Sequence, residues 1–185
     1  MANHVVLVGL MGSGKTTVGR RLAARLDRPF VDADAVLEEA ADRTIAQLFE
    51  QDGETAFREL ESDTFEELLE HDQPRVIASG GGLVLRSGNR ARLRRQDVTV
   101  VFLDAGPAFL ASRVESKPHR PLLHGPESTL DVITRLHGER ASLYAGVADL
   151  IVPVEPFHTR EEKPKRALAE RIAELVVAHE ARVTA

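Results

Sequence analysis

The chain has 185 residues, enough for one domain with a proper hydrophobic core. Hydrophobic residues make up 43% and charged residues 29%, as in an ordinary globular protein. The formal charge of −5 argues against a nucleic-acid binder, and the absence of cysteine excludes disulfides and thiol chemistry. No segment approaches the ~20 apolar residues of a membrane span, and the short apolar run near the N-terminus is not a secretory signal. We therefore expect a cytoplasmic enzyme that binds neither nucleic acid nor a membrane.

The first predicted strand, Val5–Val8, leads directly into the stretch GLMGSGKTT, Gly9 to Thr17. Its spacing, G-x-x-x-x-G-K-T, is that of the loop that cradles phosphates, because glycines let backbone N–H groups curl around an anion. An amphipathic helix that begins near Gly14 would add its positive N-terminal end. The alternative is a chance match in a glycine-rich turn, which the flanking strand and helix disfavour.

This loop predicts a site for a nucleoside triphosphate. Lys15 would reach the β- and γ-phosphates, and the Thr16 hydroxyl would ligate Mg²⁺. The loop residues that we expect to contact the nucleotide are Gly12, Ser13, Gly14, Lys15, Thr16 and Thr17.

The second predicted strand, Pro29–Asp32, ends in two carboxylates, Asp32 and Asp34. Ligands collect at the carboxyl ends of strands in an open parallel sheet. The strand period of two would place both carboxylates on one side if the extended form persists. One could then hold the waters of the metal while the other addresses a substrate hydroxyl. The alternative is that Asp34 simply N-caps a helix at Ala35–Ala41, which would not exclude a role in the site.

Three helical patterns follow without a strand between them: Asp34–Ala41, Thr44–Glu50 and Glu54–Glu70. The segment is too long for a plain connection. We therefore predict a substrate-binding insertion at about residues 34–71.

The last of these helices carries an ionisable pair. Glu61 lies within an apparent apolar stripe of Phe57, Leu60, Thr64 and Leu68, and Arg58 precedes it by one helical turn. A carboxylate on a core-facing stripe needs a partner, so Arg58 would be oriented and would present its fork to an anion. The alternative is an exposed, weakly stabilising pair.

The third predicted strand, Val76–Ser79, runs into Gly80, Gly81 and Gly82. Consecutive glycines are costly in chain entropy, but they make sense where a ligand approaches the backbone closely. The alternative is a plain flexible turn. Strands at Val98–Leu103 and Leu150–Val154 would complete a five-stranded parallel sheet covered by helices on both faces, an α/β fold.

Three further arginines are candidates for anion binding. Ser116–Pro126 is rich in proline and predicts a mobile lid, from which Arg120 could reach transferring phosphates; a solvated loop charge is the alternative. Arg140 shares a helical face with Ile133, Leu136 and Leu143 and therefore needs an anion. Arg113 could stack on an adenine face.

The histidines are scattered without metal-ligand spacing. A terminal helix is predicted at Glu161–Glu180.

In this order and spacing the motifs resemble bacterial shikimate kinase over about Val5 to Val152. They are the Gly9–Thr17 loop, VDAD at 31–34, DGETAFRELE at 52–61, SGGG at 79–82, RPLL at 120–123 and ERASLY at 139–144.

The resemblance implies a three-layer P-loop kinase fold, like that of nucleoside-monophosphate kinases, in a single domain. Its core would be residues 1–33, 72–115 and 127–185, and its lid about 116–126. The implied reaction gives shikimate 3-phosphate and ADP from shikimate and ATP, within chorismate and aromatic amino-acid synthesis. The enzyme would act as a monomer, with one Mg²⁺ ion.

The resemblance also implies the roles of individual residues. Lys15, Asp34 and Arg120 would be catalytic, with Asp34 as the base, and Thr16 would ligate the metal with Asp32 behind it. Arg113 and Arg120 would join the loop in binding ATP. The substrate would contact Asp34, Phe49, Phe57, Arg58, Glu61, Gly80, Gly81, Gly82 and Arg140, with Arg58 and Arg140 on its carboxylate.

One segment departs from the family pattern: residues 153–164 do not match the short loop that the family uses near adenine. Two other functions remain as alternatives. A related kinase for gluconate or another polyol acid would keep the phosphate loop but need not keep Asp34, Arg58, Gly80–Gly82 and Arg140 together. A nucleotide-dependent switch would be expected to lack the base or the metal-binding hydroxyl.

Overall fold

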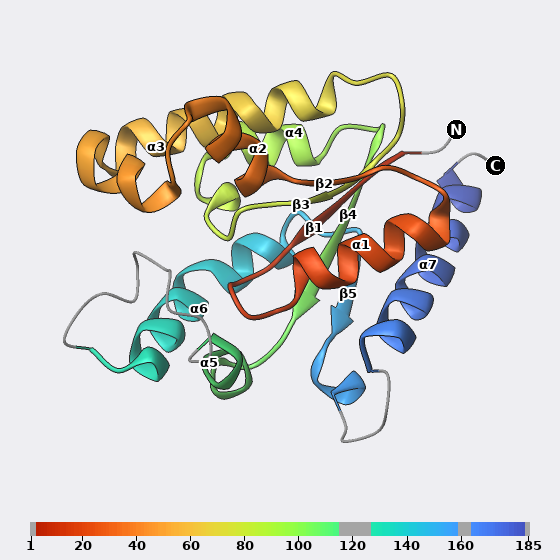
Figure 1. Ribbon diagram of the computed structural model, residues 1–185. Helices are drawn as coiled ribbons and strands as arrows, with labels where there is room; N and C mark the ends of the chain where they lie inside the picture. Colours follow the sequence, from red (N-terminus) through yellow and green to blue (C-terminus); the bar gives the residue numbers. More distant parts are fainter. Residues whose placement is uncertain (1–2, 115–126, 159–163, 184–185) are drawn as a thin grey trace.

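The protein is described by a computed structural model at residues 3–114, 127–158 and 164–183. Its parallel strands form one sheet in the order β2-β3-β1-β4-β5 (Figure 1). The α/β fold predicted from the sequence is confirmed, and each predicted strand is present with ends that differ by at most one residue. The strands are β1 (His4–Val8), β2 (Phe30–Asp32), β3 (Val76–Ala78), β4 (Val98–Asp104) and β5 (Leu150–Pro153).

The central strand β1 explains why the sheet could be read from the sequence. All of its residues are buried, because β3 and β4 flank it and helices cover both faces. Its Val6 pairs with Ile77 on one side and Val100 on the other. A strand buried in this way needs a continuous apolar run rather than an alternating pattern.

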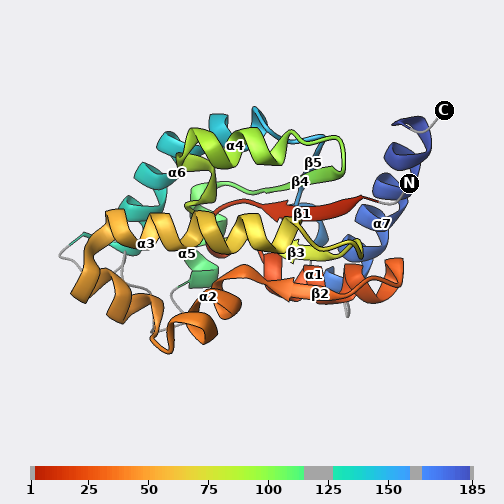
Figure 2. The same cartoon turned by 90° about the horizontal axis from the view of Figure 1, so that it is seen from above.

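Helices cover the two faces of the sheet (Figure 2). The pair α1 (Lys15–Leu26) and α7 (Pro164–Val183) packs together on one face, while α4 (Ser87–Leu93) and α6 (Thr129–Ala145) lie on the other. A further helix, α5 (Pro107–Val114), packs against α6. Short 3₁₀ turns follow β3 at Leu83–Leu85 and β5 at Glu155–Phe157.

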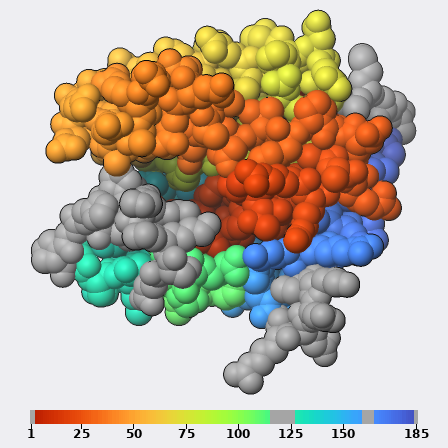
Figure 3. Space-filling model, viewed as in Figure 1, coloured from red at the N-terminus to blue at the C-terminus, as the bar shows by residue number. Residues whose placement is uncertain are grey.

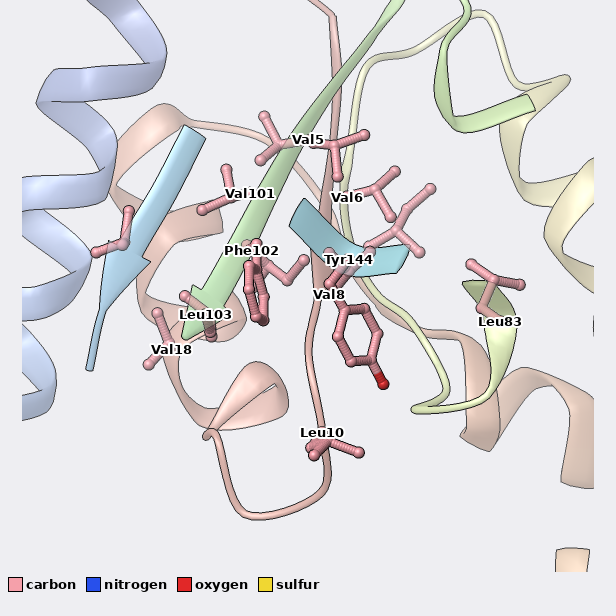
Figure 4. Packing of buried hydrophobic residues seen from close by; sticks show 14 of the residues in the cluster. Val5, Val6, Val8, Leu10, Val18, Leu83, Val101, Phe102, Leu103 and Tyr144 are labelled. Atoms are coloured by element: carbon pink, nitrogen blue, oxygen red, sulfur yellow. The ribbon is translucent and has the colours of Figure 1, made fainter. Parts of the chain in front are cut away.

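Side chains from both sides of β1 form the main core. Figure 4 shows Val18 of α1, Phe102 of β4 and Tyr144 of α6 in one apolar cluster around β1. Both ends of the chain lie at the same pole of the molecule, where Arg28 pairs with Glu180 at 2.7 Å (Figure 1). In the part of the chain that the structure describes, no helix is long and apolar enough to cross a membrane.

The segment after β2 forms α2 (Ala33–Ala41) and α3 (Ile45–Leu69). Helix α3 bends at Gly53 (φ 80°, ψ 170°), so the two predicted helices appear as its two halves. A capping box between Thr44 and Gln47 fixes its start. Leu37, Leu48 and Phe57 form a small core apart from the main one. The boundaries of the insertion stay a prediction.

The buried face of α3 corrects the predicted stripe. Leu60 is 37% exposed and Thr64 only half-buried, whereas Arg58 and Glu61 lie on the inner face with Phe65. The inward position predicted for Glu61 is confirmed, but the apolar spacing misled at Leu60 because the charged Arg58 is buried in its place. The pairing of Arg58 with Glu61 is therefore not the exposed contact that was the alternative.

The start of α2 settles the position of Asp34. The N-cap is Asp32, with no side-chain cap, and Asp34 lies in the first turn. The capping alternative for Asp34 is therefore wrong, and the extended strand conformation ends before Asp34.

At the other end of the chain, α7 reaches Val183 rather than Glu180. The predicted lid and the predicted helix start at Glu161 lie outside the described residues.

Candidate functional site

A cavity of about 890 Å³ opens at the carboxyl edge of the sheet. In the space-filling view a recess lies between the lobe formed by α2 and α3 and the core below it (Figure 3). The ends of β1, β2 and β3 and the helices α3, α5 and α6 all contribute to its wall. The predicted site residues that line it are Gly12, Gly14, Lys15, Thr16, Thr17, Asp32, Asp34, Phe49, Phe57, Arg58, Glu61, Gly80, Gly81, Gly82, Arg113 and Arg140.

The loop between β1 and α1 has the backbone of an anion cradle. Gly9, Gly12 and Gly14 have φ values of 142°, 86° and 96°. A Cβ on Gly12 would lie 2.8 Å from the carbonyl oxygen of Leu110, so the loop has room only for glycine there. Lys15 Nζ donates to the carbonyl oxygens of Gly9 (2.7 Å) and Leu10 (3.1 Å). Its ammonium group is therefore held inside the loop, beside the first turn of α1.

Two oxygen donors meet beside this loop. The Thr16 hydroxyl donates to Asp32 Oδ2 at 2.8 Å, which joins the first turn of α1 to the end of β2. A hydroxyl and a carboxylate are hard oxygen ligands of the kind that Mg²⁺ takes, together with phosphate oxygens and water. No cluster of three or more His, Cys, Asp or Glu side chains suited to a metal occurs among the described residues. The pair fits a Mg²⁺ ion that takes most of its ligands from a nucleotide.

Asp34 faces the same cavity from the first turn of α2. Burial raises its pKa to about 6, and the charges of Asp32 and Glu61 act in the same direction, while Lys15 opposes them. Such a carboxyl group is ionised at neutral pH and can also accept a proton within the physiological range. The position suits a general base.

Arg58 and Glu61 form a buried ion pair on α3. Their side chains are joined at 2.8 Å, and the residues are only 8% and 5% exposed. Glu54 makes a second ion pair with Arg58 at 3.1 Å from its solvent side. Burial raises the pKa of Glu61, but the neighbouring charges of Arg58 and Arg140 counter it. The pair holds the Arg58 guanidinium fixed toward the cavity.

The glycines after β3 lie against these charged groups. A Cβ on Gly82 would overlap the Arg58 guanidinium. A Cβ on Gly80 would overlap Glu61 Oε1 and lie 2.8 Å from Asp34 Oδ1. The stretch is therefore not a plain flexible turn. Because glycine has no side chain, the backbone at Gly80 and Gly82 can approach the charged groups of Arg58, Glu61 and Asp34 closely.

Arg140 reaches the same region from α6. It is 4% exposed, and its Nη1 donates to the Gly81 carbonyl oxygen at 3.2 Å. Within the described residues, its buried Nε has no hydrogen-bond partner. A buried guanidinium with a spare donor is a strong attraction for an anion.

Arg113 lies at the other end of the cavity. Its Nε donates to the Gly12 carbonyl oxygen at 2.8 Å, and its guanidinium lies 5.4 Å from the centre of the Phe109 ring. Lys165, from the first turn of α7, also lines this end. Positive groups from α5 and α7 therefore converge beside the phosphate loop.

Two predicted site residues are not among those that line the cavity in the described part of the chain, for different reasons. Ser13 is fully buried behind the loop, and Arg120 lies outside the described residues. The sequence reading in turn missed Glu54 and Lys165. Glu54 could have been found, because it precedes Arg58 by one helical turn. Lys165 follows the segment that departs from the family pattern and carried no such signal.

Comparison with known proteins identifies the family. A sequence model described as shikimate kinase matches residues 11–176. The chain belongs to the shikimate kinase family. Two shikimate kinases illustrate this. The one from Paracidovorax citrulli is 45% identical over 80% of this chain and 81% of its own. The one from Symbiobacterium thermophilum is 43% identical over 94% of each chain.

Solved structures of shikimate kinases share the fold along nearly the whole chain. The Acinetobacter baumannii enzyme in complex with shikimate is 34% identical, with a TM-score of 0.86, over 97% of this chain and 95% of that one. The Bacteroides thetaiotaomicron enzyme is 32% identical, with a TM-score of 0.85, over 94% and 98%. The family assignment made from the motifs is therefore confirmed.

Proposed function

We propose that the protein transfers the γ-phosphoryl group of ATP to the 3-hydroxyl of shikimate, giving shikimate 3-phosphate and ADP. The observation that carries this proposal is the convergence of two buried arginines, Arg58 and Arg140, on the cavity that also holds the phosphate loop and Asp34. Such a site takes an acid that also carries a hydroxyl. The shikimate kinase from Acinetobacter baumannii, which shares the fold, was solved with shikimate.

At one end of the cavity the substrate carboxylate would bind to Arg58 and Arg140. Phe49 and Phe57, whose ring centroids are 4.5 Å apart, would form an apolar wall beside it. The Gly80–Gly82 backbone would lie alongside. Charge-assisted contacts of two forked guanidinium groups fix the orientation of the acid as well as its affinity.

At the centre, Asp34 would accept the proton of the attacking hydroxyl. Its raised pKa makes it a stronger base than an ordinary aspartate while it stays ionised at neutral pH. The oxygen of that hydroxyl then bonds to the γ-phosphorus, and the bond from this phosphorus to the β–γ bridging oxygen breaks. Lys15 would stabilise the charge that gathers on the phosphoryl oxygens.

Thr16 and Asp32 would hold the Mg²⁺ ion. When bound, this ion neutralises phosphate charge and orients the β- and γ-oxygens. Arg113 would contact the adenine end of ATP. The role of Arg120 on the phosphates, the monomeric state and the cytoplasmic location rest on the sequence alone.

The direct test is ADP release by the purified protein with shikimate, gluconate, quinate or no acid. We expect rapid release only with shikimate, because the cavity pairs a carboxylate site with a base at a fixed separation. Equal or faster turnover with gluconate would favour the related polyol-acid kinase. Nucleotide binding without phosphorylation of any acid would favour a nucleotide-dependent switch.

Removing one arginine of the pair should affect the acid far more than the nucleotide. We expect Arg140→Ala to raise the KM for shikimate by about 10–100-fold, the cost of a charge-assisted hydrogen bond, with little change in the KM for ATP. For Arg58 the better variant is Arg58→Lys, because alanine would leave Glu61 buried without its partner. Steady-state kinetics of both variants provide the measurement.

The double variant tests whether the two arginines share one ligand group. If both grip the same carboxylate, the combined loss should be smaller than the sum of the single losses. Arg135→Ala is the matched control, since Arg135 lies on the same helix as Arg140 but is exposed. Additive losses directed at ATP would contradict the shared carboxylate site.

A further inference from the structure

Tyr144 lies on α6 and contacts the glycines that follow β3. It is 1% exposed and stacks on Phe102, with ring centroids 5.2 Å apart. Figure 4 shows its ring among the apolar side chains and its hydroxyl pointing out of the cluster. That hydroxyl donates a hydrogen bond to the Gly81 carbonyl oxygen. The ring thus belongs to the core, whereas the hydroxyl acts on the wall of the cavity.

The same carbonyl oxygen also accepts the bond from Arg140 Nη1. Tyr144 and Arg140 are one helical turn apart, so a single face of α6 presents both donors. A carbonyl oxygen has two lone pairs, and these two bonds use both. With the hydroxyl in place, the carbonyl can take only one N–H from Arg140, whose buried Nε is left without a partner among the described residues.

Gly81 differs from the glycines on either side of it. A Cβ on Gly81 would make only ordinary contacts, at 3.7 Å from the Gly9 carbonyl oxygen and 3.8 Å from the Met11 nitrogen. On Gly80 or Gly82 it would collide with charged side chains. The contribution of Gly81 therefore lies in its carbonyl, which sits between the phosphate loop and α6.

We propose that Tyr144 is a positioning residue for the acid substrate: its hydroxyl holds the Gly81 carbonyl and thereby sets the Gly80–Gly82 backbone and the Arg140 fork at the carboxylate site. This inference rests on the proposed function and names the residue that orients its carboxylate-binding end. Burial raises the pKa of Tyr144, so the hydroxyl keeps its proton and remains a donor throughout the working pH range.

The first test removes only the hydroxyl. We expect Tyr144→Phe to raise the KM for shikimate by about 3–10-fold, the worth of one neutral hydrogen bond, while kcat and the KM for ATP stay within about two-fold. Ile133→Val is the matched control on the same helix, because Ile133 is fully buried and its side chain cannot donate a hydrogen bond to Gly81. It should cost comparable thermal stability and leave both KM values unchanged.

The second test uses the emission of Tyr144 itself. The chain has one tyrosine and no tryptophan, so tyrosine emission reports on this side chain alone. Binding of shikimate beside Gly81 should change that emission in the wild-type protein. The Tyr144→Phe protein has no tyrosine left and serves as the blank.

The outcomes separate the two proposals. A wild-type protein that does not phosphorylate shikimate overturns both. An active wild type with an unchanged shikimate KM in Tyr144→Phe, or with an equal rise in both KM values, overturns the positioning role alone. The same holds if shikimate at saturation, verified by calorimetry, leaves the wild-type emission unchanged.

Discussion

A Lys15→Met protein should fold normally and lose turnover. The lysine ammonium is held by the Gly9 and Leu10 carbonyl oxygens at 2.7 and 3.1 Å, at the start of α1 and on the wall of the cavity. A fixed charge of this kind counts most where charge moves among phosphate oxygens in a water-poor site. We expect kcat to fall by at least about 10²–10³-fold, the usual cost of losing one preorganised donor.

The measurement is kcat at saturating ATP and shikimate, together with the melting temperature. Methionine keeps the apolar stem of the lysine, so the packing of α1 should survive. Arg21→Met is the matched control, because it removes a positive charge from the exposed face of the same helix. A folded Lys15→Met protein with near-normal kcat would refute the role of the phosphate loop.

The sequence predicted the sheet and the phosphate loop because their signals are local. Val5–Val8 is a continuous apolar run, and the glycines and lysine that follow it have a spacing tied to one backbone geometry. Strand β1 is buried on all sides, so each of its positions requires an apolar residue. The loop backbone has positive φ values at positions that therefore require glycine. Neither depends on residues far away in the chain.

The inner face of α3 could not be read so directly. Apolar periodicity placed Glu61 on the inner face correctly, but it also pointed to Leu60, whereas tertiary packing turns Arg58 inward because it pairs with Glu61 there. The start of α2 was also uncertain, since Asp32 and Asp34 are equally good capping residues by type. Only the structure shows that Asp32 is the N-cap and that Asp34 faces the cavity.

The link between Tyr144 and Gly81 shows what sequence patterns leave out. Tyr144 stood within the ERASLY motif but had no predicted role, because its partner is a backbone carbonyl distant in the chain. Every residue has a backbone carbonyl, so the residue type at a position does not show that its carbonyl accepts a hydrogen bond from a distant side chain. The same applies to Lys165, whose place on the cavity wall depends on how α7 packs beside α1.

Asp34→Asn should lower kcat by about 10²-fold or more, the usual scale of general acid–base catalysis. Asparagine keeps the shape of the side chain but cannot accept the proton of the attacking hydroxyl. ATP binding should change little, because the phosphates are held by the loop. Single-turnover assays separate the two steps: weakened ATP binding with an unchanged chemical step would contradict the assignment of Asp34 as the base.

The same substitution should stabilise the fold, and the effect should depend on pH. Burial raises the pKa of Asp34 from 3.8 to about 6, so the folded state holds its proton more tightly than the unfolded state. The wild-type protein therefore loses stability as the pH rises from about 4 to about 6, and the whole loss is present above that range. Asp34→Asn removes this loss.

We expect the melting temperature of Asp34→Asn to exceed that of the wild type by several degrees at pH 8 and by about half as much at pH 5, because pH 5 lies midway between the two pKa values. Each kcal/mol corresponds to about 2–4 °C in a chain of this size. In the wild type, kcat/KM for shikimate should fall as the pH drops through about 6, because protonated Asp34 cannot act as a base. Asp63→Asn, on the exposed side of α3, is the matched control and should show neither effect.

An equal gain in melting temperature at both pH values would show that Asp34 does not titrate in this range. The gain at pH 8 and the loss of kcat would then need separate causes, whereas a half-buried, basic carboxylate on the cavity wall accounts for both.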